Sequence, residues 1–248
     1  MTMLAVKIVQ HLLWLFLILI VYAGPASGQS SFTDSTNPAL SNTLRIYANA
    51  TGTQAGFYNG VQYRRYPNFI TSGQPFFIAD SLINGTVTYD GVRYENVKLQ
   101  YDEVNDQLIT TDVQGDNLVQ LYKPKVSAFS IGSHIFTNLT SGNYPGPGYY
   151  RVLYSGKSQI IVKEVKSIQV RTGDTRDQTI RSVEGSVDYY LKTQKGYTKF
   201  NRLNSFLSLF GKDRKAVAGF IKDKRLKYRQ DKENLFYQAV TFYDQLTD

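Results

Sequence analysis

Apolar and polar residues alternate through the middle of the chain, from about residue 57 to residue 200, and turn residues interrupt this alternation at short intervals. A period of two is typical of strands that bury one face. The clearest unit runs from Gly85 to Tyr94, where Asp90-Gly91 suits a two-residue type I′ turn that pairs Tyr89 with Val92. The pattern therefore predicts a β-hairpin at this point.

Beyond this hairpin the apolar positions fall one residue out of step, and a bulge at Glu95-Asn96 would return them to the inward face. Many short strands separated by turn residues are typical of an antiparallel meander. We expect further strands at residues 107–113, 118–122, 126–131, 134–139, 149–154 and 159–165, a polar stretch at 171–185, and a last hairpin from 187–191 and 197–200.

Helical periodicity precedes and follows this region. Asn37-Pro38 supplies a cap and a first-turn proline, which predicts a short helix over residues 38–48. After residue 204, Asp213 and Asp231 are each placed to cap a helix. The expected buried positions are Phe206, Leu209 and Phe210, then Val217, Phe220 and Ile221, then Leu235, Ala239, Phe242, Tyr243 and Leu246.

These elements predict an α+β fold that is mainly β. We expect a curved antiparallel sheet or incomplete β-barrel, with a short N-terminal helix and two to three C-terminal helices packed on it. The expected division is a signal peptide at 1–28, a flexible tether at 29–36, the β domain at 37–200 and a basic helical segment at 201–248.

The first 28 residues have the pattern of an export signal. Lys7 supplies positive charge, residues 12–22 form an uninterrupted apolar run, and Ala26-Ser27-Gly28 offers a small-residue cleavage site. A retained membrane anchor is the alternative, although the apolar run is short for a span of about 20 residues. We expect a periplasmic, outer-membrane-associated or extracellular protein with no transmembrane segment after cleavage.

Composition removes several kinds of chemistry. The chain has no Cys, which excludes disulfides, thiolate metal sites and Cys nucleophiles. Its one Trp and one of its two His lie in the leader, so cleavage would leave His134 as the single histidine. We expect neither a cofactor nor a bound metal.

Three carboxylates, Asp102, Glu103 and Asp106, are the first catalytic candidates, because paired carboxylates can perform acid–base hydrolysis or bind Ca²⁺. Their spacing matches no Asp-x-Asp-x-Asp-Gly loop, and a turn that uses Asp and Asn for local hydrogen bonds is the alternative. His134 is the second candidate, with Ser130 or Ser133 as a nearby hydroxyl. Neither serine lies in a Gly-x-Ser-x-Gly elbow, so an ordinary turn or sheet-face histidine is the alternative.

Nearly all of the net charge of +8 belongs to the last quarter of the chain. Residues 29–191 carry 14 Lys and Arg against 14 Asp and Glu, whereas residues 192–248 carry 13 against 6. Such asymmetry indicates an acidic partner, and a solvated helix face is the alternative. The candidates for contact with an anionic surface are Lys212, Arg214, Lys215, Lys222, Lys224 and Arg225.

A family resemblance is carried, in this order, by Gly73–Phe77, Gly85–Asp102 with Asp106-Gln-Leu108, Val126–Phe129, Lys212–Lys215, Phe220–Lys224 and Tyr243–Leu246. These segments resemble a family of exported proteins of Bacteroidota that has no assigned activity. The resemblance implies a Gram-negative envelope setting and a single module, and it implies no catalytic residue.

We therefore expect a non-catalytic binding or structural module whose partner is an envelope component: a protein, a glycan or an anionic lipid surface, and no nucleic acid. A lipid or small-ligand carrier with an aromatic-lined barrel interior and a hydrolase that uses Asp or Glu are the alternatives. An empty apolar interior would favour the carrier. Carboxylates that converge in a cleft would favour the hydrolase.

Overall fold

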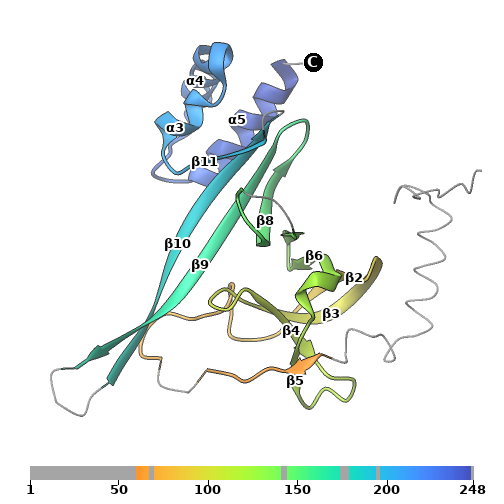
Figure 1. Cartoon of the computed structure of the whole chain (residues 1–248). Helices are drawn as coiled ribbons and strands as arrows, with labels where there is room; N and C mark the ends of the chain where they lie inside the picture. The colour runs from red at the N-terminus through yellow and green to blue at the C-terminus, as the bar shows by residue number, and fades with distance from the viewer. Residues whose placement is uncertain (1–59, 67–69, 141–143, 174–178, 194–195, 247–248) are drawn as a thin grey trace, which may run out of the picture. The chain divides into compact units, whose positions relative to one another are not determined.

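The computed structural model describes residues 60–66, 70–140, 144–173, 179–193 and 196–246, all within one compact unit that spans residues 42–248. Eleven strands form a single antiparallel sheet in the order β1-β5-β4-β3-β2-β6-β7-β8-β9-β10-β11 (Figure 1). The strands are β1 (Val61–Gln62), β2 (Ile83–Tyr89), β3 (Val92–Asp102), β4 (Gln107–Thr111), β5 (Leu118–Gln120), β6 (Val126–Ile131), β7 (His134–Leu139), β8 (Gly148–Ser155), β9 (Gln159–Thr172), β10 (Thr179–Thr193) and β11 (Gly196–Phe200).

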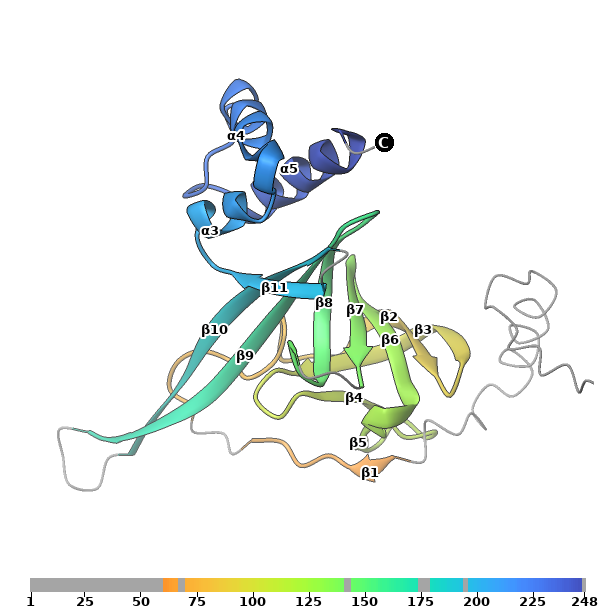
Figure 2. The same cartoon turned by 45° about the horizontal axis from the view of Figure 1, so that its top comes forward.

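The sheet is open, because β1 and β11 are its two edges and do not pair with each other (Figure 2). Hairpins extend it from β2 to β5 in one direction and from β6 to β11 in the other. The short 3-10 helix η3 (Lys123–Lys125) returns the chain so that β6 pairs with β2. The α+β, mainly β fold is thus confirmed, while the helix expected at 38–48 lies outside the described residues.

The hairpin of β2 and β3 has the predicted register. Tyr89 pairs with Val92, and the two turn residues have the positive φ angles that a type I′ turn requires, 53° at Asp90 and 79° at Gly91. The register shifts so that Glu95 and Asn96 together face the single residue between Gly85 and Val87. The predicted bulge is therefore present, and it directs Val97, Leu99 and Tyr101 into the core.

The prediction that residues 171–185 form a polar stretch between strands is wrong, because most of these residues lie in β9 and β10. β9 continues to Thr172, and β10 begins at Thr179 and pairs with β9 without interruption. Both faces of this end of the hairpin are largely exposed, so the sequence has no apolar alternation there. Residues 71 and 72, which precede β2, bond to the side of β10 that faces away from β9. Thr71 N–H donates to Arg181 O (2.8 Å), and Val183 N–H donates to Ser72 O (2.9 Å).

Two main clusters fill the interior. The first, which we call the sheet core, lies among β2 to β8, and Phe129 and Phe136 stack in parallel at its centre with 4.6 Å between ring centroids. Its buried members are Phe77, Val87, Val97, Leu99, Tyr101, Leu108, Leu121, Val126, Phe129, Ile131, Phe136 and Tyr149.

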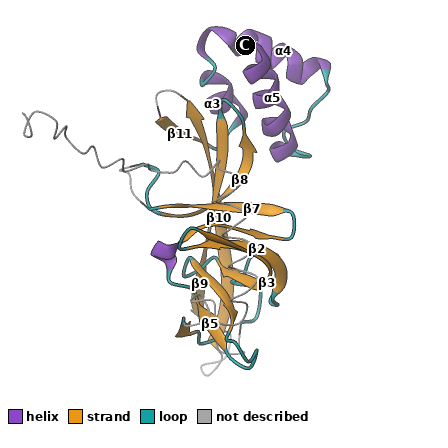
Figure 3. Ribbon diagram, turned by 90° about the vertical axis from the view of Figure 1, so that its right-hand side faces the viewer, coloured by secondary structure: helices purple, strands orange, loops and turns teal. Residues whose placement is uncertain are grey.

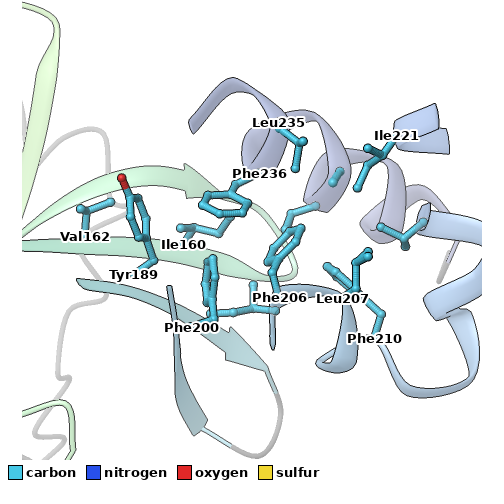
Figure 4. Close-up of a cluster of buried hydrophobic side chains, with 14 residues drawn as sticks. Ile160, Val162, Tyr189, Phe200, Phe206, Leu207, Phe210, Ile221, Leu235 and Phe236 are labelled. Carbon is cyan, nitrogen blue, oxygen red and sulfur yellow. The ribbon is translucent and has the colours of Figure 1, made fainter. Parts of the chain in front are cut away.

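The second cluster, the helix-covered core, lies between the strands β8 to β11 and the C-terminal helices (Figure 4). Phe200 of β11 contacts Phe206 and Phe236 from two different helices, with ring centroids 4.9 Å apart in each case. The helices are α3 (Leu203–Ser208), α4 (Arg214–Asp223) and α5 (Lys232–Leu246), with the 3-10 helix η4 (Gly211–Asp213) before α4 (Figure 3).

The predicted helix caps are met in part. Asp231 accepts a hydrogen bond from Asn234 N–H (3.0 Å) and so caps α5. Asp213 stands immediately before α4 but makes no side-chain cap bond. The inward orientation expected for Leu246 is wrong, because this residue is 48% exposed at the end of α5.

Candidate functional site

Asp102, the first of the three candidate carboxylates, ends β3 and is completely buried. Tyr63 and Tyr66 donate their hydroxyls to Oδ2 at 2.9 and 2.8 Å. The backbone N–H groups of Val104 and Asn105 donate to Oδ1 at 2.9 and 3.1 Å, and Asn105 Nδ2 donates to Oδ2 at 2.9 Å. Donors therefore surround the carboxylate, which leaves it no place for a substrate.

Burial raises the pKa of the Tyr63 and Tyr66 phenols, and the neighbouring Asp102 carboxylate raises it further. Both hydroxyls therefore stay protonated and act as donors. Asp102 thus joins the segment around β1 to the turn after β3, and its role in this geometry is structural.

Glu103 follows directly in the turn, and only 1% of its side chain is exposed. Lys166 of β9 places Nζ 2.7 Å from Oε2, and its backbone N–H donates to Glu103 O at 3.1 Å. Burial raises the pKa of Glu103 to about 7, and the nearby Glu164 carboxylate raises it too, while Lys166 opposes both. Glu103 therefore belongs to the contact between the turn and the long hairpin.

Asp106 is the turn residue immediately before β4, and it lies among cations. Its carboxylate accepts from Tyr101 OH at 2.6 Å, pairs with Lys163 Nζ at 2.9 Å and also bonds to Lys123 Nζ. Burial alone would raise the pKa of Asp106, but Lys163, Lys123 and Tyr101 hold it below its usual value. Gly148 makes room for this group, since a Cβ there would lie 2.7 Å from Asp106 Oδ2.

The three carboxylates therefore bind three separate sets of partners, and they do not share a cleft as hydrolysis would require. The local Asp and Asn hydrogen bonds predicted for a turn are present at Asp102 and Asn105. Within the described residues, no group of three or more His, Asp and Glu side chains is placed to hold a metal ion.

His134, the other catalytic candidate, begins β7 and pairs with Ile131. Its ring packs edge-to-face against Phe77 with 5.1 Å between centroids. Ser130, its expected hydroxyl partner, accepts from Thr86 N–H at 3.1 Å across the neighbouring strand. The structure thus places His134 on the border of the sheet core and does not join it to Ser130.

An ion-pair chain centred on the buried Arg151, which the sequence does not predict, connects the sheet to α5. Arg151 of β8 pairs through Nη2 with Glu164 Oε1 of β9 and with Glu233 Oε1 of α5, both at 2.7 Å. Tyr189 of β10 also donates its hydroxyl to Glu233, at 3.0 Å. The one feature of the sequence that bears on this contact is Glu233, an acidic residue in the first turn of α5.

The six basic candidates of the C-terminal segment are all exposed. They lie in η4, in α4 and in the turn that follows it: Lys212, Arg214, Lys215, Lys222, Lys224 and Arg225. Three further cations, Lys227, Arg229 and Lys232, are exposed just beyond them. We call these nine side chains the basic helical surface.

Comparisons with protein-family models, with curated proteins and with solved structures find no match to this chain. In the part of the chain that the structure describes, no helix is both long enough and apolar enough to cross a membrane. The contacts of the candidate carboxylates, of His134 and of the basic helical surface are therefore the basis for assigning a function.

Proposed function

We propose that the protein is an exported, non-catalytic binding module of the cell envelope. The observation that carries this proposal is the use of every candidate catalytic side chain in structural contacts. Asp102 accepts hydrogen bonds from five donor groups, Glu103 and Asp106 pair with lysines, and His134 packs on Phe77. Catalysis needs groups that reach a substrate. Asp102 and Asp106 are held by several donors, and Glu103, whose Oε1 has no hydrogen-bond partner among the described residues, has a side chain that is only 1% exposed.

The filled interior supports a binding module over a carrier. Aromatic rings occupy the centre of the sheet core, where Tyr101 contacts Phe129, Phe136 and Tyr149 with centroids 5.3 to 5.7 Å apart. A pocket of about 300 Å³ lies outside this core. Its lining is mixed in polarity and consists of Arg65, Tyr66, Ile70, Gly73, Gln74, Pro75, Phe76 and Asp80. A lipid carrier would need an apolar cavity inside the sheet.

The binding surface is then on the outside of the molecule, and the structure offers a charged one. Residues 29–191 carry balanced charge, whereas residues 192–248 carry 13 cations against 6 acids, and nine of these cations are exposed on and around the C-terminal helices. An excess of one sign on one segment favours association with a partner of the opposite sign. Export, an envelope location and an anionic envelope partner are thus parts of one proposal.

Sedimentation with envelope fragments tests this proposal. The protein purified from cells that express the full chain is mixed with washed envelope fragments and centrifuged. We expect saturable recovery in the pellet, unchanged in Glu103→Gln and His134→Gln variants, because neither side chain lies on the binding surface. An unrelated soluble protein fused to residues 1–28 reports retention by the leader alone.

Two results would contradict the proposal. Recovery in the supernatant at every fragment concentration, or recovery no greater than that of the leader fusion, would exclude envelope binding. A stoichiometric apolar ligand in native mass spectra of the purified protein would support the carrier instead.

A further inference from the structure

The basic helical surface has more uncompensated charge than its sequence indicates. None of its nine cations forms an ion pair with another residue that the structure describes, although Lys232 Nζ lies over the Tyr189 ring at 4.9 Å. Four acids occur in or beside the same stretch: Asp213, Asp223, Asp231 and Glu233. Their placement decides how much of the positive charge they neutralise.

The fold turns one of these acids away from the surface. Glu233 receives two hydrogen bonds from Arg151, at 2.9 and 2.7 Å, so its carboxylate is held against the sheet, although the charge of Lys232 also acts on it. Asp231 holds the N-terminus of α5 through Asn234 N–H. The exposed cations therefore outnumber the acids left near them.

Partly exposed apolar side chains occur on the same helices as these cations, and two of them meet between α4 and α5. Phe220 and Phe242 stack in parallel with 4.3 Å between ring centroids. Leu246 follows Phe242 by one helical turn and is 48% exposed. Lys224 follows Phe220 by the same interval, so cations and apolar groups are neighbours on the helix surface.

We propose that the basic helical surface binds the headgroup region of an anionic phospholipid bilayer. Lysine and arginine side chains would contact lipid phosphates, while Phe242 and Leu246 would lie at the boundary with the acyl chains. The apolar residues favour a bilayer over a soluble polyanion, which requires cations alone. This inference rests on the proposed function and specifies its partner.

Vesicle binding tests the inference with two variants of equal charge. The first, Lys222→Glu/Lys224→Glu/Arg225→Glu, alters the basic helical surface. The control, Arg64→Glu/Arg93→Glu/Lys98→Glu, alters three exposed cations of the sheet domain. Both variants carry the same N-terminal region. Any binding caused by insertion of residues 12–22 into the vesicle bilayer is therefore the same in both variants. Circular dichroism melting establishes that both variants fold.

We expect the protein to sediment with vesicles of phosphatidylglycerol and phosphatidylcholine, and much less with phosphatidylcholine alone. Each cation near an anionic surface contributes about five-fold in partitioning, so the helical variant should bind about a hundred-fold more weakly. The control should stay within about two-fold of wild type. Leu246→Ser should weaken binding to vesicles and leave binding to soluble polyphosphate unchanged.

Equal loss in the two charge variants would overturn the inference, because net charge alone would then explain binding. Binding to polyphosphate without binding to phosphatidylglycerol vesicles would also overturn it, in favour of a soluble polyanion. Binding to envelope fragments that persists in the helical variant would refute the lipid partner and leave the proposed envelope function intact.

Discussion

The Arg151 guanidinium holds two carboxylates of different elements at once. It donates to Glu233 of α5 at 2.9 and 2.7 Å, and to Glu164 of β9 at 3.1 and 2.7 Å. Glu233 is 82 residues away along the chain. Only 9% of the Arg151 side chain is exposed, so this cation joins the last helix to the sheet in an environment with little water.

Replacing Arg151 with Met should therefore destabilise the protein strongly. The change leaves Glu164 and Glu233 close together without their shared cation. Both carboxylates are partly exposed, so we expect a loss of about 2–3 kcal/mol, the usual contribution of hydrogen bonds to charged groups. The measurement is the free energy of unfolding in urea. Arg171→Met is the matched control: its pair with Glu184 is exposed, so the loss should be below about 1 kcal/mol.

A double variant separates the contribution of the Arg151–Glu233 ion pair from that of the packing around the Arg151 side chain. In Arg151→Met/Glu233→Gln the carboxylate repulsion is relieved, so the loss should be smaller than the sum of the two single losses. Additive losses would show that the two residues do not interact.

Asp102→Asn should destabilise the fold although the two side chains have nearly the same shape. An amide presents its own N–H₂ group to donors that now bond to a carboxylate oxygen, including the hydroxyls of Tyr63 and Tyr66. Hydrogen bonds to a charged group contribute about 1.5–3 kcal/mol, so we expect a loss of about 3 kcal/mol. Urea unfolding measures it, with Asp116→Asn on an exposed turn as the control. Equal stability of Asp102→Asn and wild type would contradict this account.

Glu103 should make stability depend on pH near neutrality. Its pKa is about 7 in the folded protein against 4.5 ordinarily, so folding favours the protonated form. The contribution of this group is fully present below about pH 4.5 and is lost as the pH rises through about 7. Lys166 and Glu164 face Glu103, and Arg151 pairs with Glu164.

We therefore expect wild type to lose about 2 kcal/mol of unfolding free energy from about pH 5 to about pH 8, relative to Glu103→Gln. Asp106 and Glu233 do not oppose this trend, because their pKa values are lowered and both stay ionised over that window. Urea unfolding at several pH values measures the difference. Parallel pH profiles for the two proteins would disprove the assignment.

Local chemistry explains which parts of the fold the sequence could predict. The type I′ turn at Asp90-Gly91 and the bulge at Glu95-Asn96 depend on residues next to one another, and both are present. The long ends of β9 and β10 escaped prediction because exposure on both faces removes the apolar alternation. This end of β10 is held by backbone hydrogen bonds to Thr71 and Ser72. Backbone bonds do not depend on the side chains, so the sequence pattern does not reveal them.

The same distinction applies to the candidate site. Asn105 bonds to Asp102 from three residues away, and turn chemistry predicts this contact. Tyr63 and Tyr66 come from 39 and 36 residues away, and only the folded sheet brings them to the carboxylate. Glu233 stands among the C-terminal cations in the sequence, and only the folded structure shows that it bonds to Arg151.

Gly148→Ala should disturb the charged group around Asp106. Gly148 has a φ of 143°, which L residues rarely adopt, and an added Cβ would lie 2.7 Å from Asp106 Oδ2 and 2.8 Å from Lys163 Nζ. Backbone strain costs about 1–3 kcal/mol, and displacing the ion pair adds to this cost. Gly146→Ala is the matched control, since its φ is 101° and its Cβ would meet nothing within 4 Å. Unfolding free energies should therefore fall further for Gly148→Ala than for Gly146→Ala, and equal losses would show that strain alone is responsible.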